Sequence, residues 1–99
     1  MLVEKVRALA AAHPDRVATC EYAVDGVPEC IVGVALAGAG WSVKALWEES
    51  RSAWGLWRGG LLPGVSEADA HWLQRMQAAQ DAGLTWADAV ALADKERGQ

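Results

Sequence analysis

The dipeptide Asp25-Gly26 constrains the fold more than any other feature of the chain, because it specifies a tight reversal of the backbone. Both residues tolerate positive φ, and short loops of this kind join two antiparallel strands. Residues 17–24, which precede the turn, are rich in β-forming side chains. The sequence therefore predicts a β-hairpin whose first strand lies within residues 17–24.

The segment after the turn has two interpretations. Cys30, Ile31 and Val32 could form the returning strand, or Pro28 could be the first position of a helix that reaches Ala39. We favour a brief returning strand that merges into that helix. Gly40 is then suited to end the helix in a left-handed conformation.

Helical spacing of apolar residues predicts a first helix over residues 2–12, which ends near Ala12 because Pro14 restricts the residue before it. Ser42 is placed to cap another helix through its hydroxyl. We expect this helix to continue to residue 57, although Gly55 weakens its last turn. Its apolar side would consist of Val43, Leu46, Trp47, Trp54 and Trp57.

Residues 59–64, with the sequence GGLLPG, predict a loop. Ser66 and Thr85 each precede an aspartate by three residues, a spacing typical of helix N-termini, and Gly83 separates the two helices that they begin. The expected buried positions are Trp72, Leu73, Met76 and Ala79 in the first of these helices and Trp86, Ala89, Val90 and Ala93 in the second.

These elements predict one α+β domain, mostly α, that spans residues 1–99: an N-terminal helix, one short β-hairpin, then three or four packed helices. Hydrophobic residues make up 53% of the chain and charged residues 22%, as in folded globular proteins. The net charge of -4 disfavours nucleic acid as a partner. The longest apolar run, residues 30–41, is too short to cross a membrane, so we expect a soluble cytoplasmic protein.

The two cysteines have two possible relations. A three-residue loop with Gly26 as a bulge would place Cys20 opposite Cys30, whereas a two-residue loop would place Cys30 opposite Glu21. The first register permits a disulfide. We favour two buried, reduced thiols, because cytoplasmic proteins rarely contain disulfides.

No residue pattern of a catalytic or cofactor site is present in the sequence. A zinc site would need about four ligands, and Cys20, Cys30, His13 and His71 lack the close spacings of zinc-binding motifs. The serines lack a nucleophile elbow, and the glycines do not form a phosphate-binding loop. We therefore expect a protein that is not an enzyme and binds no cofactor or metal.

Six tryptophans and no phenylalanine are unusual for 99 residues, since each indole can bury on the order of 200 Å². Helical spacing places Trp47, Trp72 and Trp86 on core-facing sides. Trp54 and Trp57 lie beside glycines, and either they are exposed or they close over the core as a lid.

The region 47–62 is the predicted binding surface, because exposed tryptophan beside arginine has the composition of an interface hot spot. We expect a non-enzymatic interaction or regulatory protein that docks on a protein partner or on a second copy of itself. The candidate residues are Trp47, Trp54, Leu56, Trp57, Arg58, Leu61 and Leu62.

An alternative function is a DNA-binding regulator. Residues 77–92 resemble a helix-turn-helix in their alanine, glycine and apolar positions, which would place the helix from Trp86 in the major groove. Its forward positions are Ala87, Asp88 and Ala91, and Asp88 has the wrong sign of charge to meet phosphates.

Two segments carry a resemblance to a known family. Residues 28–36 (PECIVGVAL) and 80–90 (QDAGLTWADAV) resemble the P-x-C-I-V-G-x-x-L and Q-D-x-G-x-x-W-x-x-A-V segments of small uncharacterised proteins from actinobacteria and their phages. The resemblance implies an actinobacterial or phage setting. That family has no assigned activity, so the resemblance implies no catalytic residue, and the tryptophan-rich residues 41–57 are not part of its pattern.

Overall fold

The computed structural model describes residues 2–18 and 21–97, and its elements confirm a mostly helical α+β fold. A two-stranded antiparallel hairpin follows the first helix, and further helices complete the chain. In chain order the elements are α1 (Leu2–Ala12), β1 (Ala23–Val24), β2 (Val27–Pro28), α2 (Ile31–Gly38), α3 (Val43–Glu48), α4 (Ala53–Arg58), α5 (Glu67–Asp81) and α6 (Trp86–Glu96).

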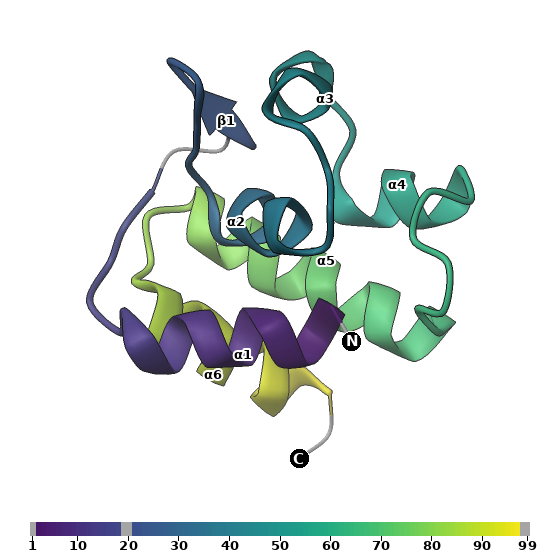
Figure 1. Cartoon of the computed structure of the whole chain (residues 1–99). Helices are drawn as coiled ribbons and strands as arrows, with labels where there is room; N and C mark the ends of the chain where they lie inside the picture. The colour runs from purple at the N-terminus through teal and green to yellow at the C-terminus, as the bar shows by residue number, and fades with distance from the viewer. Residues whose placement is uncertain (1, 19–20, 98–99) are drawn as a thin grey trace.

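The helices are arranged about α2 and α5. Figure 1 shows α1 and α6 on one side of this pair, with the hairpin and α3 on the opposite side. α5 packs against α4 and α6 as well as against α2, while α3 contacts both strands. None of the described helices is long and apolar enough to cross a membrane.

The hairpin has the two-residue loop. Asp25 and Gly26 both have positive φ, 52° and 79°, and Val24 pairs with Val27. The backbone N–H of Cys30 donates to the carbonyl of Glu21 at 3.3 Å, so Cys30 faces Glu21. The Cys30 thiol is free and buried, and the predicted relation to Cys20 involves a residue outside the described ranges.

The interpretation that a brief returning strand leads into a helix is confirmed. β2 is followed directly by Cys30, whose Sγ accepts a hydrogen bond from the N–H of Gly33 at 3.2 Å and caps α2. The helix ends before Gly40, which has φ 107°, and Ser42 Oγ then caps α3 by accepting from Ala45 at 3.1 Å. The predicted caps of α5 and α6, Ser66 and Thr85, are also observed.

The prediction of one helix from Ser42 to residue 57 is wrong, because the chain is extended at Glu49 and a new helix begins after Ser52. Ser52 Oγ accepts from the N–H of Gly55 at 3.2 Å. Buried backbone amides at the start of α4 are paired with side chains of α5, which makes the interruption stable.

The core contains Trp72, Leu73, Met76, Ala79, Trp86, Ala89 and Ala93, as predicted, together with apolar residues of α1, α2, α3 and α4. Val90 is only half-buried. Trp47 was predicted to face the core, and this is wrong: its side chain is 60% exposed. Because α3 covers the hairpin and α2 with Leu46, the neighbouring Trp47 projects outward.

Candidate functional site

The seven predicted binding residues do not form one surface. Trp47 is on α3, Arg58 ends α4 and is exposed, and Leu61 in the following loop is 39% exposed. Leu61 lines a separate apolar groove with Trp41 and Leu2. Trp47 and Leu61 therefore line different hollows.

Leu56 and Leu62 were predicted to contact a partner, and their burial contradicts this. Leu56 is 0% exposed and Leu62 is 6% exposed, and both belong to the core. The short α4 packs one side against α5, which directs Leu56 inward. Leu62 lies within the glycine-rich loop, and its side chain packs into the core.

Trp54 and Trp57 are half-buried and stabilise each other. Their ring centroids are 5.1 Å apart, and Trp54 also stacks on His71 of α5 at 4.4 Å. The indole N–H of Trp57 donates to the carbonyl of Val65 at 2.7 Å, and its ring packs against the core. For Trp57 this arrangement agrees with the lid alternative.

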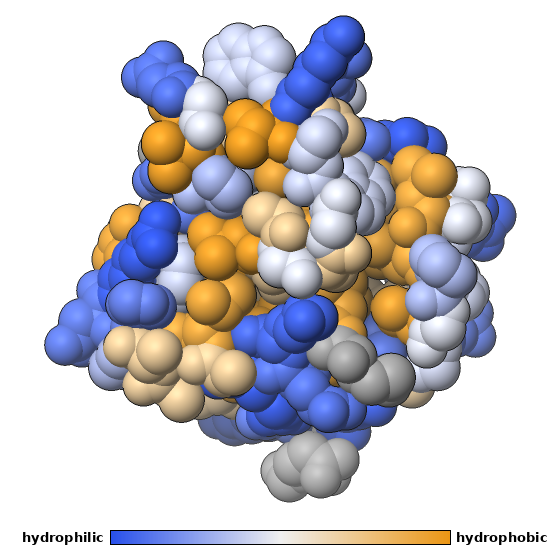
Figure 2. Space-filling view, viewed as in Figure 1, coloured by the Kyte–Doolittle hydropathy of each residue, from blue (hydrophilic) through white to orange (hydrophobic). Residues whose placement is uncertain are grey.

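Trp47 belongs to an exposed apolar group that we term the hairpin–α3 patch: Val27, Val43 and Trp47, which are 57%, 36% and 60% exposed. Figure 2 shows hydrophobic residues reaching the surface at the top of the molecule, over the hairpin and α3. Val43 and Trp47 line a hollow with Asp25 and Gly26 of the turn. The patch therefore joins the hairpin to α3.

A groove of about 840 Å³ lies beside this patch, and Trp47 lines both. Its walls come from residues 21–23 of the hairpin, from α3, from the link at residues 49–52 and from one side of α5. We term it the polar groove, because its lining includes Glu21, Glu49, Arg51 and Asp81. The fold brings Glu21 and Asp81, which are distant in the sequence, to the same groove as Glu49 and Arg51 of the link.

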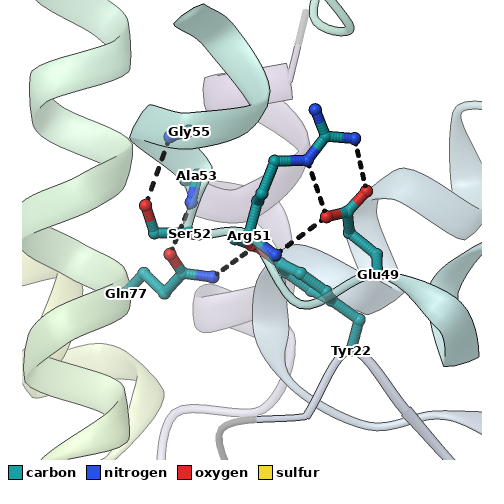
Figure 3. A network of polar contacts seen from close by, with 7 residues as sticks. All are labelled: Tyr22, Glu49, Arg51, Ser52, Ala53, Gly55 and Gln77. Atoms are coloured by element: carbon teal, nitrogen blue, oxygen red, sulfur yellow. Dashed lines mark hydrogen bonds and ion pairs between the residues drawn. The ribbon is translucent and has the colours of Figure 1, made fainter. Parts of the chain in front are cut away.

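One wall of the polar groove is a hydrogen-bonded network that joins the hairpin, the link and α5 (Figure 3). The hydroxyl of Tyr22 donates to the carbonyl of Arg51 at 2.5 Å, and Gln77 Nε2 donates to the same hydroxyl at 2.9 Å. Burial raises the pKa of Tyr22 well above its ordinary value, although its hydrogen bond with Gln77 opposes the shift. The phenol is therefore neutral and acts as a structural tie.

The charges of the polar groove are partly neutralised within it. Arg51 binds Glu49 through two hydrogen bonds of 3.0 Å, and its backbone N–H donates to the same carboxylate at 2.8 Å. The side-chain hydrogen bond from Arg51 lowers the pKa of Glu49, which stays ionised. Asp81 is exposed, but partial desolvation of its carboxyl raises its pKa, and the carboxylate accepts from Gln80 Nε2 at 2.7 Å.

The described residues offer little for nucleophilic or metal chemistry. Burial raises the pKa of the Cys30 thiol to about 12, so this sulfur is protonated at neutral pH and serves as a helix cap. No group of three or more His, Cys, Asp or Glu side chains that could hold a metal ion occurs in residues 2–18 and 21–97. His13 contacts Trp86 edge-on, and His71 is stacked on Trp54.

The polar groove was not predicted from the sequence. Tyr22, Arg51 and Gln77 are separated by tens of residues, and each has an ordinary explanation within its own segment. Their association depends on the break between α3 and α4, which places Arg51 beside the hairpin. No local spacing in the sequence indicates that contact.

Comparison with known proteins adds no relative: no family model, no curated protein and no solved structure matches this chain. The resemblance to the actinobacterial and phage family stays a prediction.

Proposed function

We propose that this chain is a non-enzymatic interaction or regulatory protein that docks on a protein partner through the hairpin–α3 patch. The observation that carries the proposal is Trp47, a large aromatic side chain that is 60% exposed on a surface formed by two elements. Tryptophan is enriched among residues that contribute most to protein binding. An exposed indole beside two exposed valines matches the apolar centre of such an interface.

Polar residues surround this apolar centre. Asp25 and Lys44 line the hollow beside Trp47, and the polar groove borders its other side. A polar rim around an aromatic centre is the usual anatomy of an interface between proteins that also exist separately. The proposed surface is thus smaller than the region 47–62 predicted from sequence, and it consists of Trp47 and its spatial neighbours.

The test is capture of partners by the full chain and by Trp47→Ala, with identification by mass spectrometry and light scattering to detect self-association. We expect Trp47→Ala to lose the specific partner or the dimer while its thermal melting stays close to that of the wild type. Leu92→Ala is the matched control, because Leu92 is an exposed apolar residue on α6. Equal capture by both variants would refute the proposed surface.

DNA binding stays as a second candidate, because α5 and α6 pack together and are joined by a tight turn in which Gly83 has φ 102°. Asp88 and Ala91 are exposed on α6, which contains no lysine or arginine before Lys95. The charge of this helix therefore opposes phosphate binding. A gel shift at low salt tests it, and absence of retardation would remove this candidate.

A further inference from the structure

We propose that the polar groove binds a basic segment of the partner protein, with one lysine or arginine side chain placed against Trp47 and between Glu21 and Asp81. The inference rests on the proposed function and gives the chemical class of the partner. It follows from the charges that line the groove, from the position of Asp81 at the end of α5 and from the exposed indole at the rim of the groove.

The charge balance of the polar groove favours a cation. Glu21, Glu49 and Asp81 contribute three carboxylates, and Arg51 contributes one positive charge. Arg51 is already bound to Glu49 at 3.0 Å. Within the described part of the chain, neither Glu21 nor Asp81 forms an ion pair with lysine or arginine.

Asp81 is the carboxylate that would gain most from a cation. It is the last residue of α5, where the helix dipole also disfavours a negative charge. Asp81 is exposed, yet partial desolvation of its carboxyl raises its pKa, and the side chain accepts a hydrogen bond from the neutral amide of Gln80. A cationic side chain in the groove would compensate this cost.

Trp47 supplies the second half of the site, because the face of an indole attracts lysine and arginine side chains. The protein already uses this contact twice in its own fold: the Arg7 guanidinium lies 4.8 Å from the Trp72 ring centre, and that of Arg16 lies 4.3 Å from Trp86. In residues 2–18 and 21–97 no arginine or lysine lies over the Trp47 ring, whose side chain is 60% exposed. An aromatic wall and two carboxylates thus border the same groove.

A basic segment of a different protein fits the groove better than a second copy of this chain. Each copy carries a net charge of -4, so two copies repel one another, whereas a basic partner is attracted. The groove, at about 840 Å³, has room for a short extended peptide and not only one side chain.

The test is selection of random short peptides on the immobilised full chain and, in parallel, on the double variant Glu21→Gln plus Asp81→Asn. The asparagine keeps an oxygen that can accept from Gln80. We expect peptides rich in lysine or arginine to be enriched on the wild type and not on the double variant. Enrichment of acidic or purely apolar peptides, or no enrichment on the wild type, would overturn the inference.

The affinity of one enriched peptide should then be measured by fluorescence anisotropy. We expect Trp47→Ala to weaken binding about tenfold, and each charge-removing variant to weaken it by up to about fivefold, with a smaller effect at high salt. Glu48→Gln is the matched control, since Glu48 is exposed on α3 and pairs with Lys44 outside the groove. An equal loss of affinity in Glu48→Gln would show that the net charge of the protein, and not the carboxylates of the polar groove, determines peptide binding. This result would contradict the proposed site.

The two proposals can fail separately. If partner capture depends on Trp47 but is unchanged in the Glu21 and Asp81 variants, the docking surface stands and the basic occupant is wrong. If light scattering instead shows a dimer that the double variant abolishes, the occupant is a second copy, which also overturns this inference.

Discussion

At the scale of single residues, Gly33 of α2 lies against the backbone of Tyr22. A Cβ added to Gly33 would overlap the carbonyl oxygen of Tyr22, and backbone atoms cannot move aside as a flexible side chain can. We therefore predict that Gly33→Ala lowers the free energy of unfolding by roughly 2–3 kcal/mol, because α2 must move away from the hairpin. Urea unfolding followed by circular dichroism measures the change.

Gly38 provides the control on the same helix. No atom lies within 4 Å of a Cβ added there, so Gly38→Ala should leave stability unchanged or raise it by up to about 1 kcal/mol. Similar losses in the two variants would mean that the contact of Gly33 with Tyr22 does not determine the effect, because alanine has the higher helix propensity at both positions.

Residue-level chemistry was the most predictable part of this molecule. Ser42, Ser66 and Thr85 were assigned as helix caps from sequence, and each side chain accepts from the backbone amide three residues later. Ser52 does the same for Gly55 but was read as a helix interior position. A serine can occupy either a helix cap or a helix interior position, and its tertiary contacts decide which of the two it takes.

At the scale of elements, three glutamines of α5 determine where other helices begin. Gln74 Oε1 accepts from the N–H of Trp54 at 3.0 Å, and Gln77 Oε1 accepts from Ala53 at 2.7 Å. One turn further along, Gln80 Oε1 accepts from Ile31 at 3.0 Å. Side chains of one helix therefore satisfy first-turn amides of α4 and α2 that have no partner within their own helices.

We predict that Gln77→Met lowers the free energy of unfolding by about 1–3 kcal/mol, because the buried amide of Ala53 and the hydroxyl of Tyr22 each lose a partner. Hydrogen exchange at Ala53 should become faster, as the start of α4 loosens. Gln74→Met is the control, since Gln74 is half-buried and water can replace it at Trp54. Equal costs at the two positions would contradict this account.

The same contacts explain why one long helix was predicted in place of α3 and α4. Apolar residues recur at helical spacing from Val43 to Trp57, and nothing within that segment shows that Gln77 will bind Ala53. The hairpin and the returning strand, by contrast, follow from Asp25-Gly26, where the required φ angles are local. Local turn chemistry was predictable; pairing across 24 residues was not.

The tryptophans also show that positions which depend on long-range contacts are not predictable from local spacing. Trp72 and Trp86 were correctly predicted as core because α5 and α6 form as expected. Trp47 was misplaced because its orientation depends on where α3 ends. The polar groove, which contains Trp47, Arg51 and Asp81, depends on that same break and could not be predicted from spacing.

At the scale of the whole molecule, one carboxylate joins the two ends of the chain. Arg7 of α1 binds Asp94 of α6 through hydrogen bonds of 2.9 and 2.6 Å, and Trp72 Nε1 of α5 donates to Asp94 at 2.8 Å. Three helices therefore meet at one side chain. The hydrogen bond from Arg7 lowers the pKa of Asp94, with a smaller contribution from Trp72.

This shift predicts a pH dependence of stability. The folded pKa of Asp94 is below its unfolded value, so the stabilisation is present above about pH 4 and is lost as the pH falls through the folded pKa. Asp94→Asn should cost about 1 kcal/mol near neutral pH, since the pair is a third or more exposed and screened by solvent. The difference from the wild type should shrink in acid.

The pH dependence of stability from Asp81 should have the opposite sign, because partial desolvation raises its folded pKa. Its carboxylate opposes folding at neutral pH, and this cost disappears on protonation. Asp81→Asn should therefore be as stable as the wild type or more so near neutral pH, with no advantage in acid. Urea unfolding of Asp94→Asn, Asp81→Asn and the wild type, from neutral to acidic pH, measures these differences in stability. If the stabilities of Asp94→Asn and Asp81→Asn changed with pH in the same way, the opposite pKa shifts of the two aspartates would be contradicted. If Asp81→Asn were less stable than the wild type near neutral pH, the Asp81 carboxylate would stabilise the fold and would not be available for a cation from a partner.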